Sequence, residues 1–385
     1  MGMSSATRPT AGRARRAAAV AGLVVLLVLP MAVIFTLLWS ARAADLTFNQ
    51  DERRGVRYLG PLTKLLDTVT QQQSEVVQGH GAVSAEVDQA VATVDAADRE
   101  EGGRLQTTER WGQLRQQILD VTGRADLNPA EAFTTYSGVV DLTVQLIRKA
   151  GDTSNLILDP KLDAYYLMNA TLLRVPEMLV SSGRYTDLVR IVAGTGKATD
   201  PDTLAQLASV RDQVLASADD LTAGLRKSFE ATRSKSLVPT LLRQLDDFRT
   251  AVDTLAPRVS PVQSGPARSP NPDGVQLNQD DLQRAAIALD GVALGQLDEL
   301  LKTRLDAIGR QRVYALAALL AGVLASGTVV IWLRPARRSG SGRAGLRPTR
   351  RHRDRATTES VDARELVASS GLALSGRRGG ARAAR

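Results

Sequence analysis

The chain has 385 residues, of which 43 % are apolar and only 4 % aromatic, and it carries a formal net charge of +8. The absence of cysteine excludes disulfides, thiolate metal sites and cysteine nucleophiles, and only His80 and His352 could serve as imidazole catalysts. The composition is rich in helix-forming residues, so we expect an all-α protein.

Two uninterrupted apolar segments, residues 17–39 and 313–333, are long enough to cross a bilayer as helices and are predicted to be transmembrane. Residues 1–16 carry a charge of +4, residues 334–385 a charge of +10, and the region between the spans a charge of −6. Positive charge outside both spans places both termini in the cytoplasm and residues 40–312 outside. We therefore expect a two-pass protein of the inner (plasma) membrane, with no specific nucleic-acid partner.

The end of the first apolar segment allows a second interpretation. Ala41-Arg42-Ala43 has the small-x-small pattern of a signal-peptidase site. Cleavage there would leave one C-terminal anchor and the same external region.

The region after the first span predicts a long packed helix. Gly55, Gly60 and Pro61 are expected to kink or restart it. From Leu59 to Ala97 apolar residues recur at steps of three and four, interrupted only at Gln73 and His80, and Glu101-Gly102-Gly103 is expected to end the helix.

The rest of the external region also predicts helices and no strand. Start signals at Asn128-Pro129, Asp159-Pro160 and Asp200-Pro201 mark helix boundaries, and further helices are expected over 105–122, 204–225 and 236–255. Residues 257–274 are rich in Pro, Ser and Gly and read as a linker, after which Asn278 is expected to cap a last helix that continues into the second span. The prediction is an elongated extracytoplasmic helical bundle, followed by a disordered basic tail over 334–385.

The sequence LDPKLDAYYLMN, residues 158–169, predicts a helix with Asp159 as N-cap and Pro160 at its first position. Tyr166 and Asn169 fall on the face that should be buried. They would meet Gln73 and His80 if the two helices pack together. Two interpretations stay open: a binding site, or a buried polar layer that fixes the register of the helices.

Three segments resemble the extracytoplasmic sensor region of bacterial transmembrane receptors: ERRGVRYLGPL at 52–62, ERW at 109–111 and SNLILDPKLDAYYLMNATLLRVPEM at 154–178. In receptors of the chemotaxis and histidine-kinase type, a helical bundle between two spans feeds a cytoplasmic output module. The resemblance covers residues 15–335 and implies a ligand-binding role for the external bundle. Together with the polar interruptions it gives the candidate ligand-binding residues Arg53, Gln73, His80, Asp163, Tyr165, Tyr166 and Asn169.

The chain departs from that family in two places. Residues 71–81, QQQSEVVQGHG, replace the turn of the receptors that is rich in Gln or His, Arg and Gly. If that turn helps to bind the ligand, the ligand of this chain differs or is absent. Leu333-Arg334-Pro335 resembles the entry to a HAMP linker, but Gly and Ser follow, and no output module is present.

The first functional hypothesis is a sensor that binds a small molecule or partner outside and passes a helix shift across the membrane to a separate signalling protein in the cytoplasm. The alternative is a membrane-anchored scaffold, or a decayed receptor, without a ligand, whose basic tail binds lipid or a partner. The seams of the first and last helices would suit a parallel homodimer. No catalytic motif, metal-ligand cluster or cofactor fingerprint is found, so an enzyme is not expected and no cofactor or metal is assigned.

Overall fold

In the computed structural model, the described residues are 11–80, 84–124, 126–159, 161–195, 200–231, 238–255 and 271–332. These residues contain helices and no strand, which confirms the all-α prediction. The basic tail, most of the expected linker and Pro160 lie outside the described residues.

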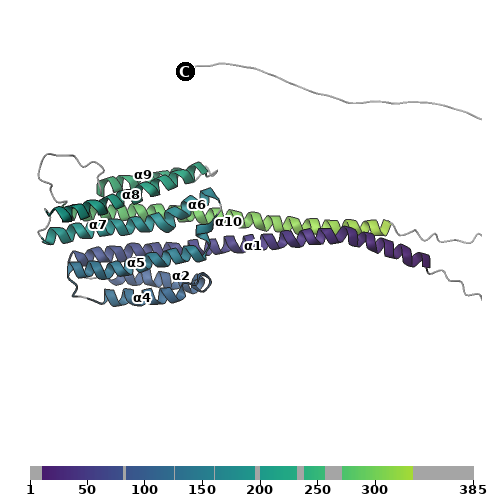
Figure 1. The fold of residues 1–385 in the computed structure, drawn as a ribbon, viewed down its shortest axis with the longest axis horizontal. Coiled ribbons are helices and arrows are strands. Elements are labelled where there is room, and N and C mark those ends of the chain that lie inside the picture. The colour runs from purple at the N-terminus through teal and green to yellow at the C-terminus, as the bar shows by residue number, and fades with distance from the viewer. Residues whose placement is uncertain are drawn as a thin grey trace, which may run out of the picture. The chain divides into compact units, whose positions relative to one another are not determined.

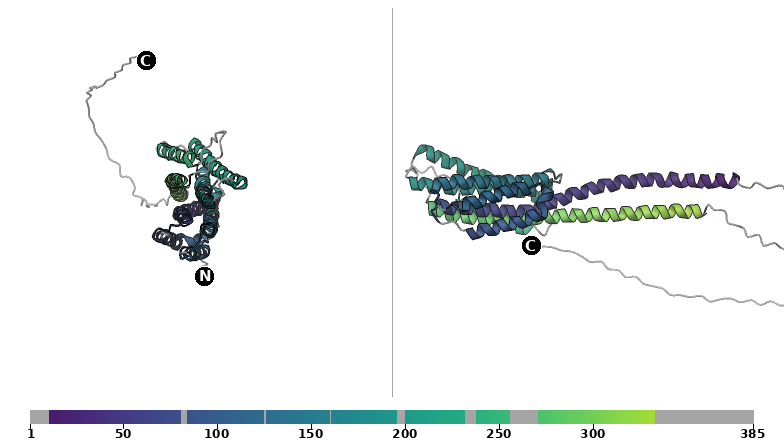
Figure 2. Two further views of the ribbon diagram at one scale, coloured as in Figure 1. Left: turned by 90° about the vertical axis from the view of Figure 1, so that its left-hand side faces the viewer. Right: turned by 90° about the horizontal axis from the view of Figure 1, so that it is seen from below.

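Two long helices run through the structure from end to end. Helix α1 (Ala11–Val77) and helix α10 (Pro272–Trp332) lie side by side within the bundle and continue together beyond it (Figures 1 and 2). Helix α1 passes through Gly55, Gly60 and Pro61 without ending, so of the expected kink or restart, the restart is wrong. Pro61 lacks the backbone N–H of a regular helix bond, but neighbouring helices pack on this part of α1 from several sides and stabilise it.

The predicted single helix over 59–101 is wrong, because the chain turns back after α1. Gly79 has a left-handed φ of +81°, and helix α2 (Ser84–Ala97) then packs against α1. The Tyr58 hydroxyl donates a 2.8 Å hydrogen bond to Asp98, which fixes the two arms of this hairpin. The expected stop at Gly102-Gly103 is also wrong, since a π-helical turn (Asp98–Gly102) leads directly into the short α3 (Gly103–Leu105).

The remaining helices surround α1 and α10. They are α4 (Thr108–Thr122), α5 (Pro129–Thr153), a 3₁₀ turn (Leu156–Leu158), α6 (Leu162–Asn169), a π-helical turn (Ala170–Arg174), α7 (Val175–Thr195), α8 (Pro201–Ala231) and α9 (Val238–Leu255). Helices α2, α5 and α7 pack on α1, while α6, α7 and α9 pack on α10. The apolar side chains that these contacts bury form one core.

Two of the three expected helix starts are confirmed. Asn128 and Glu131 form a capping box at the start of α5, and Asp200 accepts from the Thr203 N–H at the start of α8. Asp159 is not an N-cap, because α6 begins at Leu162 and the Asp159 carboxylate instead accepts from the Lys161 N–H. Asn278 does not cap the last helix either, since α10 already begins at Pro272 and the Asn278 side chain donates to the Thr254 carbonyl.

Helices α1 and α10 each contain a segment long and apolar enough to cross a membrane, and neither segment is buried in the structure. Leu26 and Leu37 of α1, like Val313 and Leu324 of α10, are more than half exposed. The two segments nevertheless touch. The Arg312 guanidinium lies 4.0 Å from the centre of the Trp39 ring, and Met31 packs directly on Gly322.

A substitution at Gly55 tests how closely α1 packs on the turn after α5. A Cβ at this position would collide with the buried Ser154 side chain and with Leu156, so Gly55→Ala should lower the free energy of unfolding by about 1–3 kcal/mol. Gly60→Ala is the matched control on the same helix, because its Cβ would meet only Leu294 at 3.8 Å and should gain about 0.5–1 kcal/mol from helix propensity. Denaturant unfolding followed by circular dichroism measures both. Equal effects of the two substitutions would contradict this packing.

Candidate functional site

The structure separates Tyr166 and Asn169 from Gln73 and His80. Asp187 of α7 accepts hydrogen bonds from Gln73 and Ser74 near the end of α1, whereas Tyr166 lies much earlier on the rod formed by α6, the π-helical turn and α7. At 1.5 Å per residue, Tyr166 and Asp187 are about 30 Å apart along that rod. His80 lies beyond Gln73, so Tyr166 and Asn169 cannot share a pocket with it.

Each candidate residue at the far end of α1 already has a partner. The Gln73 amide donates to Asp187 at 2.7 Å and is buried. His80 is exposed on the turn after α1, where its Nδ1 lies 2.8 Å from a carboxylate oxygen of Glu75. These contacts support the register-setting interpretation for Gln73.

The candidate residues of α6 whose burial the structure describes are exposed or half-buried. Tyr165 is exposed and meets the half-buried Tyr166 edge to face, with ring centres 5.4 Å apart. The Lys227 ammonium of α8 lies 5.7 Å from the centre of the Tyr166 ring. Asn169 is half-buried at the end of the helix, and Asp163 belongs to its first turn.

A layer of charged side chains closes the end of the bundle from which the apolar segments emerge. Arg53 of α1 pairs with Asp298 of α10 through two hydrogen bonds of 2.5 and 3.0 Å. Arg304 of α10 donates to Asp159 at 2.6 Å, and both side chains are almost buried. Burial and the nearby Asp159 carboxylate raise the pKa of Glu52 to about 8, while Arg304 opposes the rise. This layer joins α1, α10 and the turn before α6.

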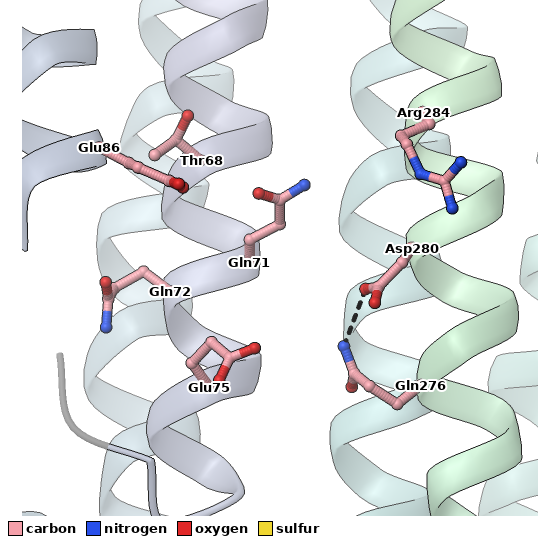
Figure 3. A pocket seen from close by; sticks show the side chains of 8 residues that line it. All are labelled: Thr68, Gln71, Gln72, Glu75, Glu86, Gln276, Asp280 and Arg284. Atoms are coloured by element: carbon pink, nitrogen blue, oxygen red, sulfur yellow. Dashed lines mark hydrogen bonds between the residues drawn. The ribbon is translucent and has the colours of Figure 1, made fainter. Parts of the chain in front are cut away.

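A polar groove lies at the opposite end of the bundle, between α1, α2 and α10 (Figure 3). Its volume is about 290 Å³, and Gln71 of α1 points toward α10, which contributes Gln276, Asp280 and Arg284 to the opposite side. Gln276 donates a 3.1 Å hydrogen bond to Asp280. The complete lining is Thr68, Gln71, Gln72, Glu75, Glu86, Gln276, Asp280 and Arg284.

Negative charge predominates in the groove. Desolvation raises the pKa of Asp280, and the nearby Glu75 carboxylate raises it further, against the lowering effect of Gln276. Beside the groove, burial raises the pKa of Asp67, and Asp280 and Glu86 add to the rise, although the Lys64 ammonium opposes it. Carboxylates and amide carbonyls in this arrangement favour a ligand that donates hydrogen bonds and carries positive charge.

Sequence reasoning missed the acids that the structure buries. Glu52 lies next to the candidate residue Arg53, but no helical spacing in the sequence marked Glu52 as buried. Asp290 does follow Ala286 by four residues on the apolar face of the last helix, and Asp187 continues the face of Tyr166, Asn169 and Val180 by helical steps. Following each face to the end of its helix would have found Asp187 and Asp290.

No known sequence family, curated protein or solved structure matches this chain. The geometry of the chain itself therefore carries the functional argument.

Arg304 provides a test of the charged layer. The side chains of Arg304 and Asp159 are 12 % and 2 % exposed, so Arg304→Met leaves a buried carboxylate without its cation and should lower the free energy of unfolding by about 3–5 kcal/mol. Arg190→Met is the control, because its partner Asp273 is 79 % exposed and such a pair contributes about 0–1 kcal/mol. Combining Arg304→Met with Asp159→Leu should recover part of the loss. If the double variant were no more stable than Arg304→Met alone, an uncompensated charge would not be the cause.

Proposed function

We propose that this chain is a membrane-anchored sensor whose helical bundle lies outside the cell membrane and passes a shift of α1 against α10 to a separate cytoplasmic protein. The observation that carries this proposal is that α1 and α10 both line the polar groove and both continue, without a break, into the exposed apolar segments. Any ligand that changes their spacing in the groove acts on the same two helices that would cross the membrane.

The register of the two helices supports mechanical coupling. Arg53 faces Asp298 within the bundle, and Trp39 faces Arg312 at the start of the apolar segments. Between these two contacts the chain advances by the same number of residues along both helices, so the pair stays in one antiparallel register. A displacement at one end therefore has a continuous packed path to the other.

The groove gives the proposed ligand a chemical class. Glu75, Glu86 and Asp280 outnumber the one cation, Arg284, whose guanidinium pairs with Asp281. A small organic amine fits this charge balance better than nitrate or an organic acid does.

The sensor function can be tested by measuring the spacing of α1 and α10. The chain has no cysteine, so Gln50→Cys and Thr303→Cys place two spin labels on exposed positions of the two helices. In lipid nanodiscs, an amine found to bind by calorimetry should shift the measured label-to-label distance, and Asp280→Asn with Glu75→Gln should abolish both binding and shift. Asp273→Asn is the matched control, because Asp273 lies on the same helix, is 79 % exposed and does not line the groove. Binding without any shift would refute signal transfer, and no binding by amines, organic acids or nitrate would favour the scaffold function.

The membrane topology has its own test. Asp202 lies at the exposed start of α8. In the variant Asp202→Cys, a membrane-impermeant maleimide added to intact cells should label the introduced cysteine. A cysteine introduced within residues 1–10 should react only after the membrane is opened. The reverse pattern would place the bundle in the cytoplasm.

A further inference from the structure

Three helices of the bundle meet along a strip of buried polar side chains, which we call the polar strip. Gly183 of α7 marks the meeting point, because a Cβ there would collide with Thr70 of α1 and come within 3.5 Å of the Gln279 amide of α10. All members of the polar strip are buried: Thr63, Thr70, Gln73 and Ser74 of α1, Ser182, Thr186 and Asp187 of α7, and Gln279, Gln283 and Asp290 of α10. The core between these helices is therefore not purely apolar.

Asp187 is one of two carboxyl groups in the polar strip. It is 1 % exposed and accepts 2.7 Å hydrogen bonds from the Gln73 amide and the Ser74 hydroxyl, both on α1. Both partners are neutral. Burial raises the pKa of Asp187 to about 7, although these two hydrogen bonds oppose the rise.

Asp290 is the second carboxyl group, and it is 3 % exposed on α10. Among the described residues its Oδ1 has no hydrogen-bond partner, and the neutral hydroxyl of Thr63 on α1 is the group that faces it. Burial raises the pKa of Asp290 to about 8, with Thr63 as the only opposing influence.

The charged groups on the surrounding helices leave both carboxyls uncompensated. No charged side chain of the described residues shifts the pKa of either acid. The basic residues nearest in sequence on these helices pair with other acids: Lys64 with Asp67 on α1, Arg184 with Asp141 of α5, Arg190 with Asp273 of α10, and Arg284 with Asp281 on α10. An ionised Asp187 or Asp290 thus brings a negative charge that no cation balances into the contact of α1 with α7 or α10.

We propose that Asp187 and Asp290 form a proton-binding switch, which keeps α1, α7 and α10 closely packed when both carboxyls are protonated and loosens that packing when they ionise. The contacts of Asp187 can accommodate both the protonated and the ionised carboxyl group. The Gln73 amide donates to the ionised carboxylate, and a half-turn of that amide would present its otherwise unpartnered carbonyl oxygen to the protonated one. The switch goes beyond the proposed function, because it operates whether or not the groove binds an amine.

The direction of the pH effect follows from the two raised pKa values. In the unfolded chain both groups ionise near the ordinary value of 3.8, whereas in the folded chain they ionise near 7 and 8. Between these values the folded state binds more protons than the unfolded state. Stability is therefore highest below about pH 4 for these groups, falls as the pH rises toward 8, and is constant above.

The test uses the full chain in lipid nanodiscs and the double substitution Asp187→Asn with Asp290→Asn, since asparagine resembles the protonated acid. The melting temperature of the unmodified protein should fall by at least about 5 °C between about pH 5 and pH 9, and the double variant should lose less than half as much. A residual fall is expected in the variant, because Glu52, Asp67 and Asp280 also have raised pKa values. Asp273→Asn with Asp281→Asn is the matched control, since these side chains are 79 % and 58 % exposed, and it should behave like the unmodified protein.

Hydrogen exchange on the unmodified protein gives a second readout that needs no variant. After correction for the intrinsic effect of pH, amides within 60–77 and 279–293 should exchange about tenfold faster at pH 9 than at pH 5, while those of α4 should not. Unchanged protection in those two segments would overturn the proposal. So would a double variant whose melting temperature falls with pH as far as that of the unmodified protein.

Discussion

The packing of α1 against α10 is the interaction on which the rest of the structure depends. Both helices bury one face within the bundle, and the same two helices carry the exposed apolar segments. Contacts from Arg53 with Asp298 to Met31 with Gly322 keep them in one register. The other helices complete the core around this pair, and the polar groove and the charged layer both form where additional segments meet it.

Buried carboxyl groups divide into two kinds by what faces them. At the end next to the apolar segments, Asp159 has Arg304, so the charge is compensated and joins α10 to the turn before α6. In the core, Asp187 has only amide and hydroxyl partners, and the neutral Thr63 hydroxyl faces Asp290. Apolar residues at these two places would avoid the cost of desolvation. The uncompensated pair therefore makes the central contact responsive to protons, whereas Asp159 is paired with a cation.

The groove and the LDPKLDAYYLMN segment lie at opposite ends of the bundle. Tyr165 and Tyr166 lie near the end from which the apolar segments emerge, in contact with each other and with Lys227. The groove near the far end of α1 is instead lined by Gln71 and Glu75 of α1, Glu86 of α2 and Asp280 of α10. A ligand bound in the groove would therefore not contact the tyrosine pair.

The sequence by itself determined the helical class, the apolar segments and the starts of α5 and α8, because these depend on local composition, helical spacing and side chains that cap their own helix. It did not reveal the hairpin after Val77, because the apolar spacing from Leu59 to Ala97 is equally compatible with one helix or with two packed helices. Gly79 was a weak signal for the turn. Only the tertiary structure decided which polar residues meet. Helical periodicity shows that Gln73 faces the core, but not that Asp187, more than a hundred residues later, is the group it faces.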